Sequence, residues 1–207
     1  MLSLLLASLT ALAAPKSWQV DPYVLPRVGG FVFTDGNRTV SGASLGAEAG
    51  LRYNQLNRPL PRWRGVARVA GDYVLTTSDA SGMEARVGNL LGPFWKHVGA
   101  QTGPDLFWNQ YTLGSQTLDP TLGLAWPVIG RAWNKSLSAY GGVEPAWLSN
   151  ADRRVDWSSE PVPGFGHEFT WLGGVGFTVG DLGLSVGYRY RITAAGGQHG
   201  LSAGVSI

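Results

Sequence analysis

The sequence predicts an all-β fold, an antiparallel transmembrane β-barrel of about ten strands, on the strength of three observations. Apolar and polar residues alternate with a period of two over most of the chain, as they do in strands with two unlike faces. Charged residues keep to one of these faces. The 207 residues are only 14% charged and include 30 glycines, against about 25% charged and roughly 7% glycine in ordinary soluble domains.

Composition also excludes several classes of protein. The chain has no Cys, which excludes disulfide scaffolds and thiolate metal sites. Its net charge of +2 is too small to indicate nucleic acid as a partner. A hydrophobic content of 44% with nine Trp excludes intrinsic disorder, because such a chain can bury a core.

The N-terminus has the features of an export signal. Residues 4–14 are apolar apart from Ser8 and Thr10, and Ala11-Leu12-Ala13 has the small-x-small pattern of a cleavage site. The sequence therefore predicts a signal peptide over residues 1–13, with a buried N-terminal helix as the alternative. We expect residues 14–26 to form a periplasmic segment and residues 27–207 to form the barrel.

Six segments show the alternation without interruption. They are residues 41–53, 62–76, 136–147, 168–179, 182–192 and 199–207. All ten charged residues within them fall on the polar face. That face is otherwise rich in Gly and Ser, and the whole chain has only three Lys, which suits a narrow lumen better than a solvated exterior. The apolar face is then expected to meet lipid, in a closed barrel that leaves no backbone group unpaired. A soluble exported all-β protein is the alternative.

Charged side chains inside such a barrel must pair, because an unpaired buried charge is costly. We therefore predict a network that closes the lumen or passes only small ions. Its expected members are Glu48, Arg52, Arg64, Arg68, Asp72, Glu144, Glu168, Arg189 and Arg191.

The other segments are less regular. Residues 28–34, 83–101, 105–114 and 121–129 have strand-like composition, and Gly92-Pro93 predicts a bulge or bend in the second of them. Tight turns are expected at 35–37, 102–104 and 180–181, and one long loop at 149–167. An even strand count with both termini in the periplasm gives ten strands and places the long loop outside; eight strands is the alternative.

Aromatic residues are placed as two belts would require. Tyr53, Trp63 and Trp133 lie at predicted periplasmic ends of strands. The residues at predicted outer ends are Tyr73, Trp147, Trp171 and Tyr190. Trp and Tyr anchor barrels at the two membrane interfaces, so all seven are expected to face the membrane boundary.

In this alternation, and in the aromatic belts, the chain resembles the small outer-membrane β-barrel proteins of Gram-negative bacteria. The resemblance implies a place in the cell outer membrane and contact with its lipid and lipopolysaccharide. It also implies insertion by the barrel-assembly machinery, which reads a C-terminal signal. Members of the class usually end in an aromatic residue, whereas this chain ends Val205-Ser-Ile207.

No catalytic, cofactor or metal motif stands out. His97, His167 and His199 are not at ligand spacing, and no motif of a lipid A-modifying enzyme is present. We expect a non-enzymatic barrel, without cofactor or metal, with a structural or surface-binding role through its outer loops. The long loop offers Arg153, Arg154 and Trp157 as contacts to an unknown extracellular ligand or to lipopolysaccharide phosphates. A small porin-like pore, or less favourably a lipid A-modifying enzyme, is the alternative.

Overall fold

The structure is a computed structural model that describes residues 17–34, 39–77, 80–117, 120–148, 167–180, 182–192 and 197–206. Within this part of the chain every regular element is a strand, and no helix is long and apolar enough to cross a membrane. The strands are β1 (Trp18–Thr34), β2 (Thr39–Gln55), β3 (Arg62–Thr76), β4 (Ala80–Phe94), β5 (Val98–Thr102), β6 (Asp105–Leu113), β7 (Gln116–Thr117), β8 (Thr121–Ala125), β9 (Val128–Trp133), β10 (Leu137–Leu148), β11 (His167–Val179), β12 (Leu182–Ile192) and β13 (Gly197–Ser206).

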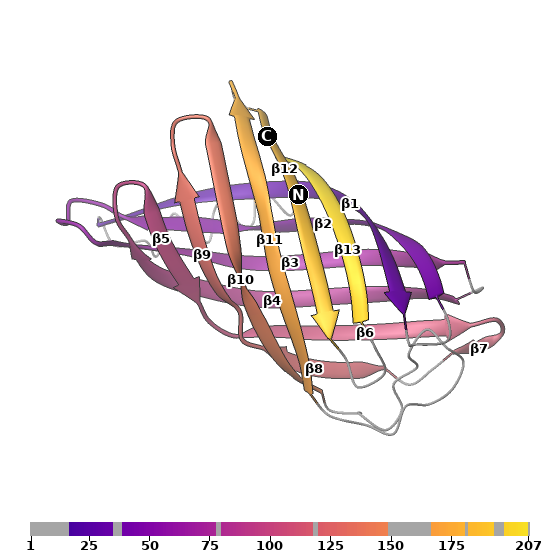
Figure 1. The fold of residues 1–207 in the computed structure, drawn as a ribbon. Helices are drawn as coiled ribbons and strands as arrows, with labels where there is room; N and C mark the ends of the chain where they lie inside the picture. Colours follow the sequence, from indigo (N-terminus) through magenta and orange to yellow (C-terminus); the bar gives the residue numbers. More distant parts are fainter. Residues whose placement is uncertain are drawn as a thin grey trace.

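These strands form one closed antiparallel barrel (Figure 1). The last strand, β13, pairs with the first, β1, so the sheet has no free edge there. β5 and β6 both pair with β4 in one register, and β8 and β9 both pair with β10, so each couple is a single strand with a break. Pro104 and Pro127, which lack the N–H that a ladder needs, stand at the two breaks. If each couple is counted as one strand and β7 as the extension of a hairpin, the barrel of the described residues has ten strands, as predicted.

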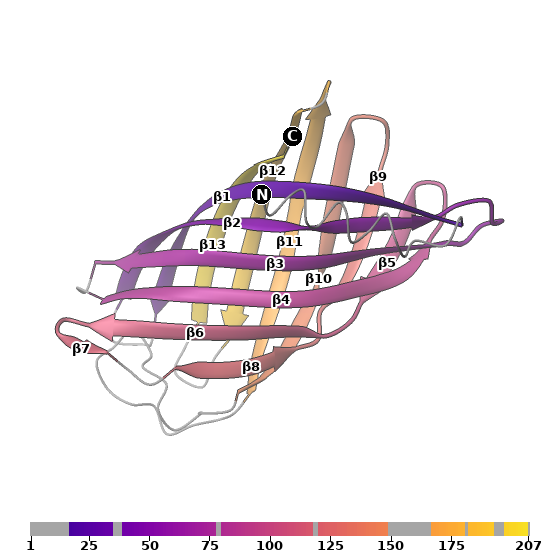
Figure 2. The ribbon, with the colours of Figure 1, turned by 180° about the vertical axis from the view of Figure 1, so that it is seen from behind.

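The antiparallel order defines two ends. One end carries the connections 56–61, 95–97 and 134–136, together with the start of β1 and the end of β13. In the expected orientation this is the periplasmic end. β10 ends and β11 begins at the opposite end, and residues 149–166, between them in the sequence, lie outside the described part. Figure 2 shows β1, β2, β3, β4 and β6 side by side from behind, in the order of their pairing.

Large apolar side chains cover the outside of the barrel. Leu45, Val87 and Leu106 are 67%, 58% and 61% exposed, and each alternates along its strand with inward-facing residues. A soluble barrel would bury such side chains and expose the polar face. The arrangement agrees with the predicted orientation of the two faces.

Thr102-Gly103-Pro104 is not the turn that the sequence predicts. The hairpin lies at Trp95–His97 instead, where Trp95 N donates to Val98 O at 2.8 Å. Gly103 lies inside the broken strand, with φ at +156° and with its hypothetical Cβ only 2.1 Å from the carbonyl oxygen of Asn89. Here the Gly-Pro dipeptide marks a close approach of two backbones and a gap in the hydrogen-bond ladder. The sequence could not distinguish this from a turn, because the same dipeptide also occurs in turns.

Gly92-Pro93 does not produce the predicted bulge. Arg64 pairs with Gly92 and Trp63 with Pro93 in the unbroken register of β3 with β4. The glycine is needed because a Cβ there would lie 1.9 Å from the carbonyl oxygen of Ala100.

The barrel also begins earlier than residue 27. β1 starts at Trp18, so residues 18–26 belong to the barrel and do not form a separate segment. Pro22 and Pro26 pair in register with β2 but lie before the part of β1 that pairs with β13, an edge position that tolerates proline. The predicted signal peptide, residues 1–13, lies outside the described residues.

Candidate functional site

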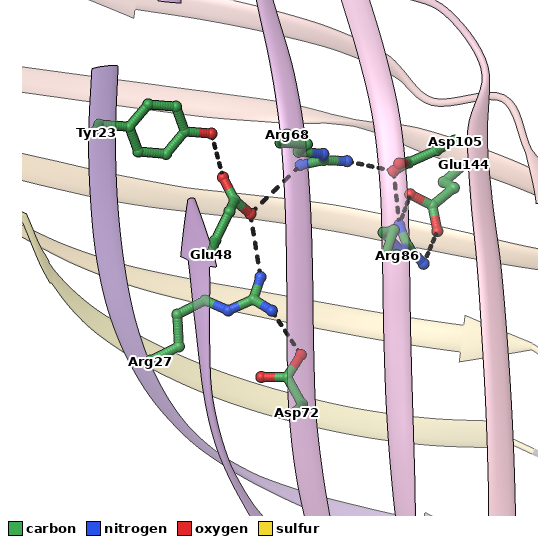
Figure 3. Close-up of polar contacts among 8 residues, drawn as sticks. All are labelled: Tyr23, Arg27, Glu48, Arg68, Asp72, Arg86, Asp105 and Glu144. Atoms are coloured by element: carbon green, nitrogen blue, oxygen red, sulfur yellow. Dashed lines mark hydrogen bonds and ion pairs between the residues drawn. The ribbon is translucent and has the colours of Figure 1, made fainter. Parts of the chain in front are cut away.

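A row of ion pairs occupies the lumen (Figure 3). It begins at Arg27 of β1, whose Nη2 lies 2.5 Å from Asp72 Oδ2 and whose Nη1 lies 3.2 Å from Glu48 Oε2. Tyr23 supports the same Glu48 carboxylate, donating its hydroxyl hydrogen to Glu48 Oε1 at 2.6 Å. Alternation places Tyr23 and Arg27 on the inward face of β1.

The row continues across the barrel. Arg68 Nη1 lies 3.9 Å from Glu48 Oε2, and Arg68 Nη2 donates to Asp105 Oδ2. Arg86 Nη1 lies 3.2 Å from the same Asp105 oxygen. The guanidinium of Arg86 also holds Glu144 with two bonds of 2.7 and 3.0 Å, the bidentate geometry that favours Arg over Lys.

The signs of charge alternate along this row. Three arginines stand between four carboxylates, in the order Asp72, Arg27, Glu48, Arg68, Asp105, Arg86 and Glu144. Around the barrel, the row reaches from Arg27 on β1 to Glu144 on β10. These two strands are separated by β11 to β13 on one side and by β2 to β9 on the other. The row therefore crosses the lumen.

Burial explains the alternation. Asp105 is fully buried, and Glu144 is 6% exposed. A carboxylate in such a place is stable only if cations and hydrogen bonds replace the water that it has lost. Each of the three arginines contacts two carboxylates, which compensates both oxygens of Glu144 and Oδ2 of Asp105; Oδ1 of Asp105 has no hydrogen-bond partner among the described residues.

Two lumen-facing glycines make room for these side chains. A Cβ on Gly88 would lie 1.9 Å from Asp105 Oδ1, and one on Gly46 would lie 2.1 Å from Asp72 Oδ1. Real Cβ atoms essentially never approach another atom so closely. These two glycines therefore leave the space that the side chains of Asp72 and Asp105 fill.

A second group lies beside the row, around a cavity of about 70 Å³. Arg191 Nε is 3.9 Å from Glu168 Oε2, and Tyr111 donates its hydroxyl hydrogen to Glu84. Arg189 also lines the cavity, and no carboxylate among the described residues lies within 4 Å of its guanidinium.

The predicted network residues divide into two sets. Ion pairs contain Glu48, Arg68, Asp72, Glu144, Glu168 and Arg191. Arg52, Arg64 and Arg189 face the lumen without such a pair in the described part. Arg52 lies over the Tyr23 ring at 4.4 Å, and Arg64 lies over the rings of Phe94 and Trp133 at 5.3 and 5.0 Å.

Sequence reasoning missed Arg27, Arg86, Asp105 and Glu84. Glu84 and Arg86 continue the period-two pattern, with Met83, Ala85 and Val87 between and beside them. The alternation continues through residues 80–94, past Gly92-Pro93, and is the signal in the sequence that points to these two residues. Arg27 fell outside because its strand was expected to begin at residue 28.

Most of the predicted belt aromatics face outward. Trp63, Tyr73, Trp147 and Trp171 are 45 to 53% exposed. Tyr53 donates its hydroxyl hydrogen to the outward Asn89 across the bare surface of Gly65, and Tyr190 stacks on His199 with ring centroids 4.5 Å apart.

Trp133 is the exception and corrects the prediction. Ile129, Arg131 and Trp133 share the inward face of β9, while Val128 faces out. The Trp133 ring packs on the buried Phe94 with centroids 5.2 Å apart. The position of a Trp at a strand end does not reveal which face it occupies, because only the alternation of the strand decides that. Arg153, Arg154 and Trp157, the predicted loop contacts, lie outside the described residues.

No protein-family model and no curated protein sequence matches the chain. Solved structures do. The β domain of the Bordetella autotransporter BrkA matches with a TM-score of 0.57 at 14% identity, over 90% of this chain and 98% of that one. Neisserial surface protein A matches with a TM-score of 0.47 at 15% identity, over 91% and 98%. The translocator domain of NalP from Neisseria meningitidis gives 0.47 at 10%, over 99% and 95%. The chain thus has the fold of a small outer-membrane β-barrel, and at these identities the likeness concerns the fold alone.

Proposed function

We propose that this protein is a bacterial outer-membrane barrel that does not act as a general porin, and that its role is structural or surface-binding, through its outer end. The observation that carries the proposal is the row of alternating charges from Asp72 to Glu144 across the lumen. Barrels of this size have an interior that side chains can fill. A solute of porin size would have to break buried ion pairs to pass.

Planar-bilayer conductance of the refolded protein tests the closed lumen. The native protein is expected to show no stable conductance comparable to that of a general porin. A double substitution, Arg86→Ala with Glu144→Ala, removes the link between β4 and β10 and is expected to raise the conductance. Lys135→Ala, which removes a charge from an exposed periplasmic turn, is the matched control and should change nothing.

A porin-like conductance of the native protein would overturn the proposal. It would instead support the small pore, the second candidate, which the exposure of the inward-facing Arg52 and Arg131 favours.

The surface role rests on the long loop that the sequence predicts at residues 149–167, of which residues 149–166 lie outside the described part and His167 begins β11. Loops longer than about 12 to 15 residues are uncommon and usually functional or disordered. This one carries Arg153, Arg154 and Trp157, residue types that dominate binding hot spots. Replacing residues 149–163 by a short Gly-Ser turn is expected to leave the barrel folded and to weaken surface binding or phage and antibiotic susceptibility. Unchanged phenotypes in a folded barrel would make the loop a simple connection.

The absence of enzymatic activity stays a prediction. Lipid A from cells with and without the gene is expected to give the same mass spectrum.

A further inference from the structure

The periplasmic half of the lumen contains cations without matching anions. Arg52 of β2, Arg64 of β3 and Arg131 of β9 all lie on inward faces there. No carboxylate of the described residues is within 4 Å of any of the three guanidinium groups. The row near the middle of the strands differs from this half, because each of its arginines bridges two carboxylates.

The three cations share one part of the lumen. Arg64 is seated over Trp133, and Arg131 is two residues from Trp133 on the same face of β9. Arg131 is within electrostatic reach of Arg68 and Arg52, which repel it, and of Glu48, which attracts it. Like charges that line one enclosed space attract a counterion, because the walls of the space focus their field into it.

Solvent reaches these groups. Arg52 and Arg131 are exposed although their strands direct them into the barrel, so a water-accessible space adjoins them. Ser138 and Thr178, on the inward faces of β10 and β11, are exposed as well and carry no charge. The hydroxyl group of Thr178 can donate to an anion, whereas that of Ser138 donates to the carbonyl oxygen of Gly176 at 3.4 Å.

The carboxylates facing this space do not neutralise it. Glu48 is already shared by Arg27, Arg68 and Tyr23. Asp21 is the register partner of Arg52, but its carboxylate accepts from Gln19 at 3.1 Å instead. Among the described residues, Asp21 is therefore the one remaining carboxylate that faces this space, which three arginine cations also face.

We infer that the periplasmic half of the lumen is a binding site for a small oxyanion, such as phosphate, held by Arg52, Arg64 and Arg131. Planar guanidinium groups bind phosphate and carboxylate oxygens in pairs, which gives the site its preference for oxyanions over halides. Arg62, Lys96 and Lys135 lie at the periplasmic mouth and have the same sign, so they steer anions toward it. The inference goes beyond the proposed function, since an anion can bind whether or not the lumen conducts.

Fluorine NMR of the refolded, 5-fluorotryptophan-labelled barrel tests the site with inorganic phosphate as the probe. The Trp133 resonance is assigned by its loss in Trp133→Phe. At constant ionic strength, phosphate is expected to shift this resonance saturably, and chloride is not. The resonance of Trp171, which is 53% exposed on the outer surface, is the internal control and should not move.

The arginines are tested by charge removal and by charge-preserving variants. Arg52→Gln with Arg131→Gln is expected to weaken phosphate binding at least fivefold, and Arg52→Lys with Arg131→Lys is expected to restore part of it. Heat-modifiable gel mobility verifies that each variant is folded.

A shift that stays linear in phosphate, or that equals the native response in a folded double Gln variant, would overturn the inference. The conductance experiment reports on lumen closure separately, so either proposal can fail without the other.

Discussion

At the scale of the residue, the row from Asp72 to Glu144 depends on each of its buried charges having a partner. Arg86 joins the two most buried carboxylates of the row, Asp105 and Glu144, and through them it ties β4 to β6 and β10. Such a pair adds little net stability compared with an apolar pair, but removing one partner leaves the other charge buried and unpaired. The loss of a single partner is therefore expected to cost more than the whole pair contributes.

Glu144→Gln is expected to destabilise the folded barrel by roughly 3 kcal/mol, because Arg86 loses its bidentate partner inside the lumen. Urea unfolding in detergent micelles measures the change. Asp21→Asn, which removes a carboxylate outside the row, should change the free energy of unfolding by much less. Equal effects of the two substitutions would show that pairing in the row does not matter for stability.

Gly88→Ala is expected to cost about 1 to 3 kcal/mol, since the new methyl group must displace the buried Asp105 carboxylate. Gly71→Ala is the matched control on the neighbouring strand, because its nearest neighbour would be 3.9 Å away. The two variants are compared by their midpoints of urea unfolding. A Gly88→Ala barrel as stable as Gly71→Ala would mean that Asp105 moves freely.

At the scale of the element, two of the ten barrel strands are broken and still keep one pairing register. β5 and β6 follow one pairing register with β4 on either side of Gly103-Pro104. The missing N–H of Pro104 and the close approach at Gly103 interrupt the ladder without inserting a residue. As a result the periplasmic turn of this hairpin is at Trp95–His97, not at residues 102–104.

Cysteine labelling checks on which side of the membrane this turn lies, and the absence of native Cys makes each introduced Cys a single reporter. In intact cells a membrane-impermeant maleimide is expected to label Ser115→Cys, at the outer end, and to leave Lys96→Cys unlabelled. Lys96→Cys should react once the outer membrane is permeabilised. Labelling of Lys96→Cys in intact cells would mean that the barrel has the opposite orientation in the membrane.

At the scale of the whole molecule, the barrel is inverted with respect to a soluble protein. Large exposed apolar side chains cover its outer surface, and the charges of its strands meet in the lumen. Lipid replaces water as the outer solvent in this arrangement, and only a closed barrel leaves no unpaired strand edge in it.

Val87→Arg is expected to destabilise the barrel in lipid by about 2 to 4 kcal/mol, because Val87 is at the centre of β4 on the outer face. The matched control is Val179→Arg, at the periplasmic end of β11, where the cost should fall to about 0 to 1 kcal/mol. Unfolding in lipid vesicles gives both values. No difference between the two positions would argue against a membrane around this surface.

The sequence alone determined the fold class, the number of ten barrel strands and the outward direction of the apolar face. Period-two alternation is a local property that each strand carries by itself, and the bounds of β3 and β12 agree with it to the residue. It also predicted that Glu48, Arg68 and Glu144 would share one interior.

Only the tertiary structure decided which charges meet. Arg86 and Glu144 are 58 residues apart, and the closure of the barrel brings them together. Spacing along a strand fixes the face that a residue occupies, but not its partner across the lumen, since strand tilt and register set that distance. The same reason explains Trp133 and the unpaired Arg52, Arg64 and Arg131. All four face inward because of the alternation along their strands. The three arginines lack a carboxylate partner because of the level in the barrel at which the acidic side chains lie.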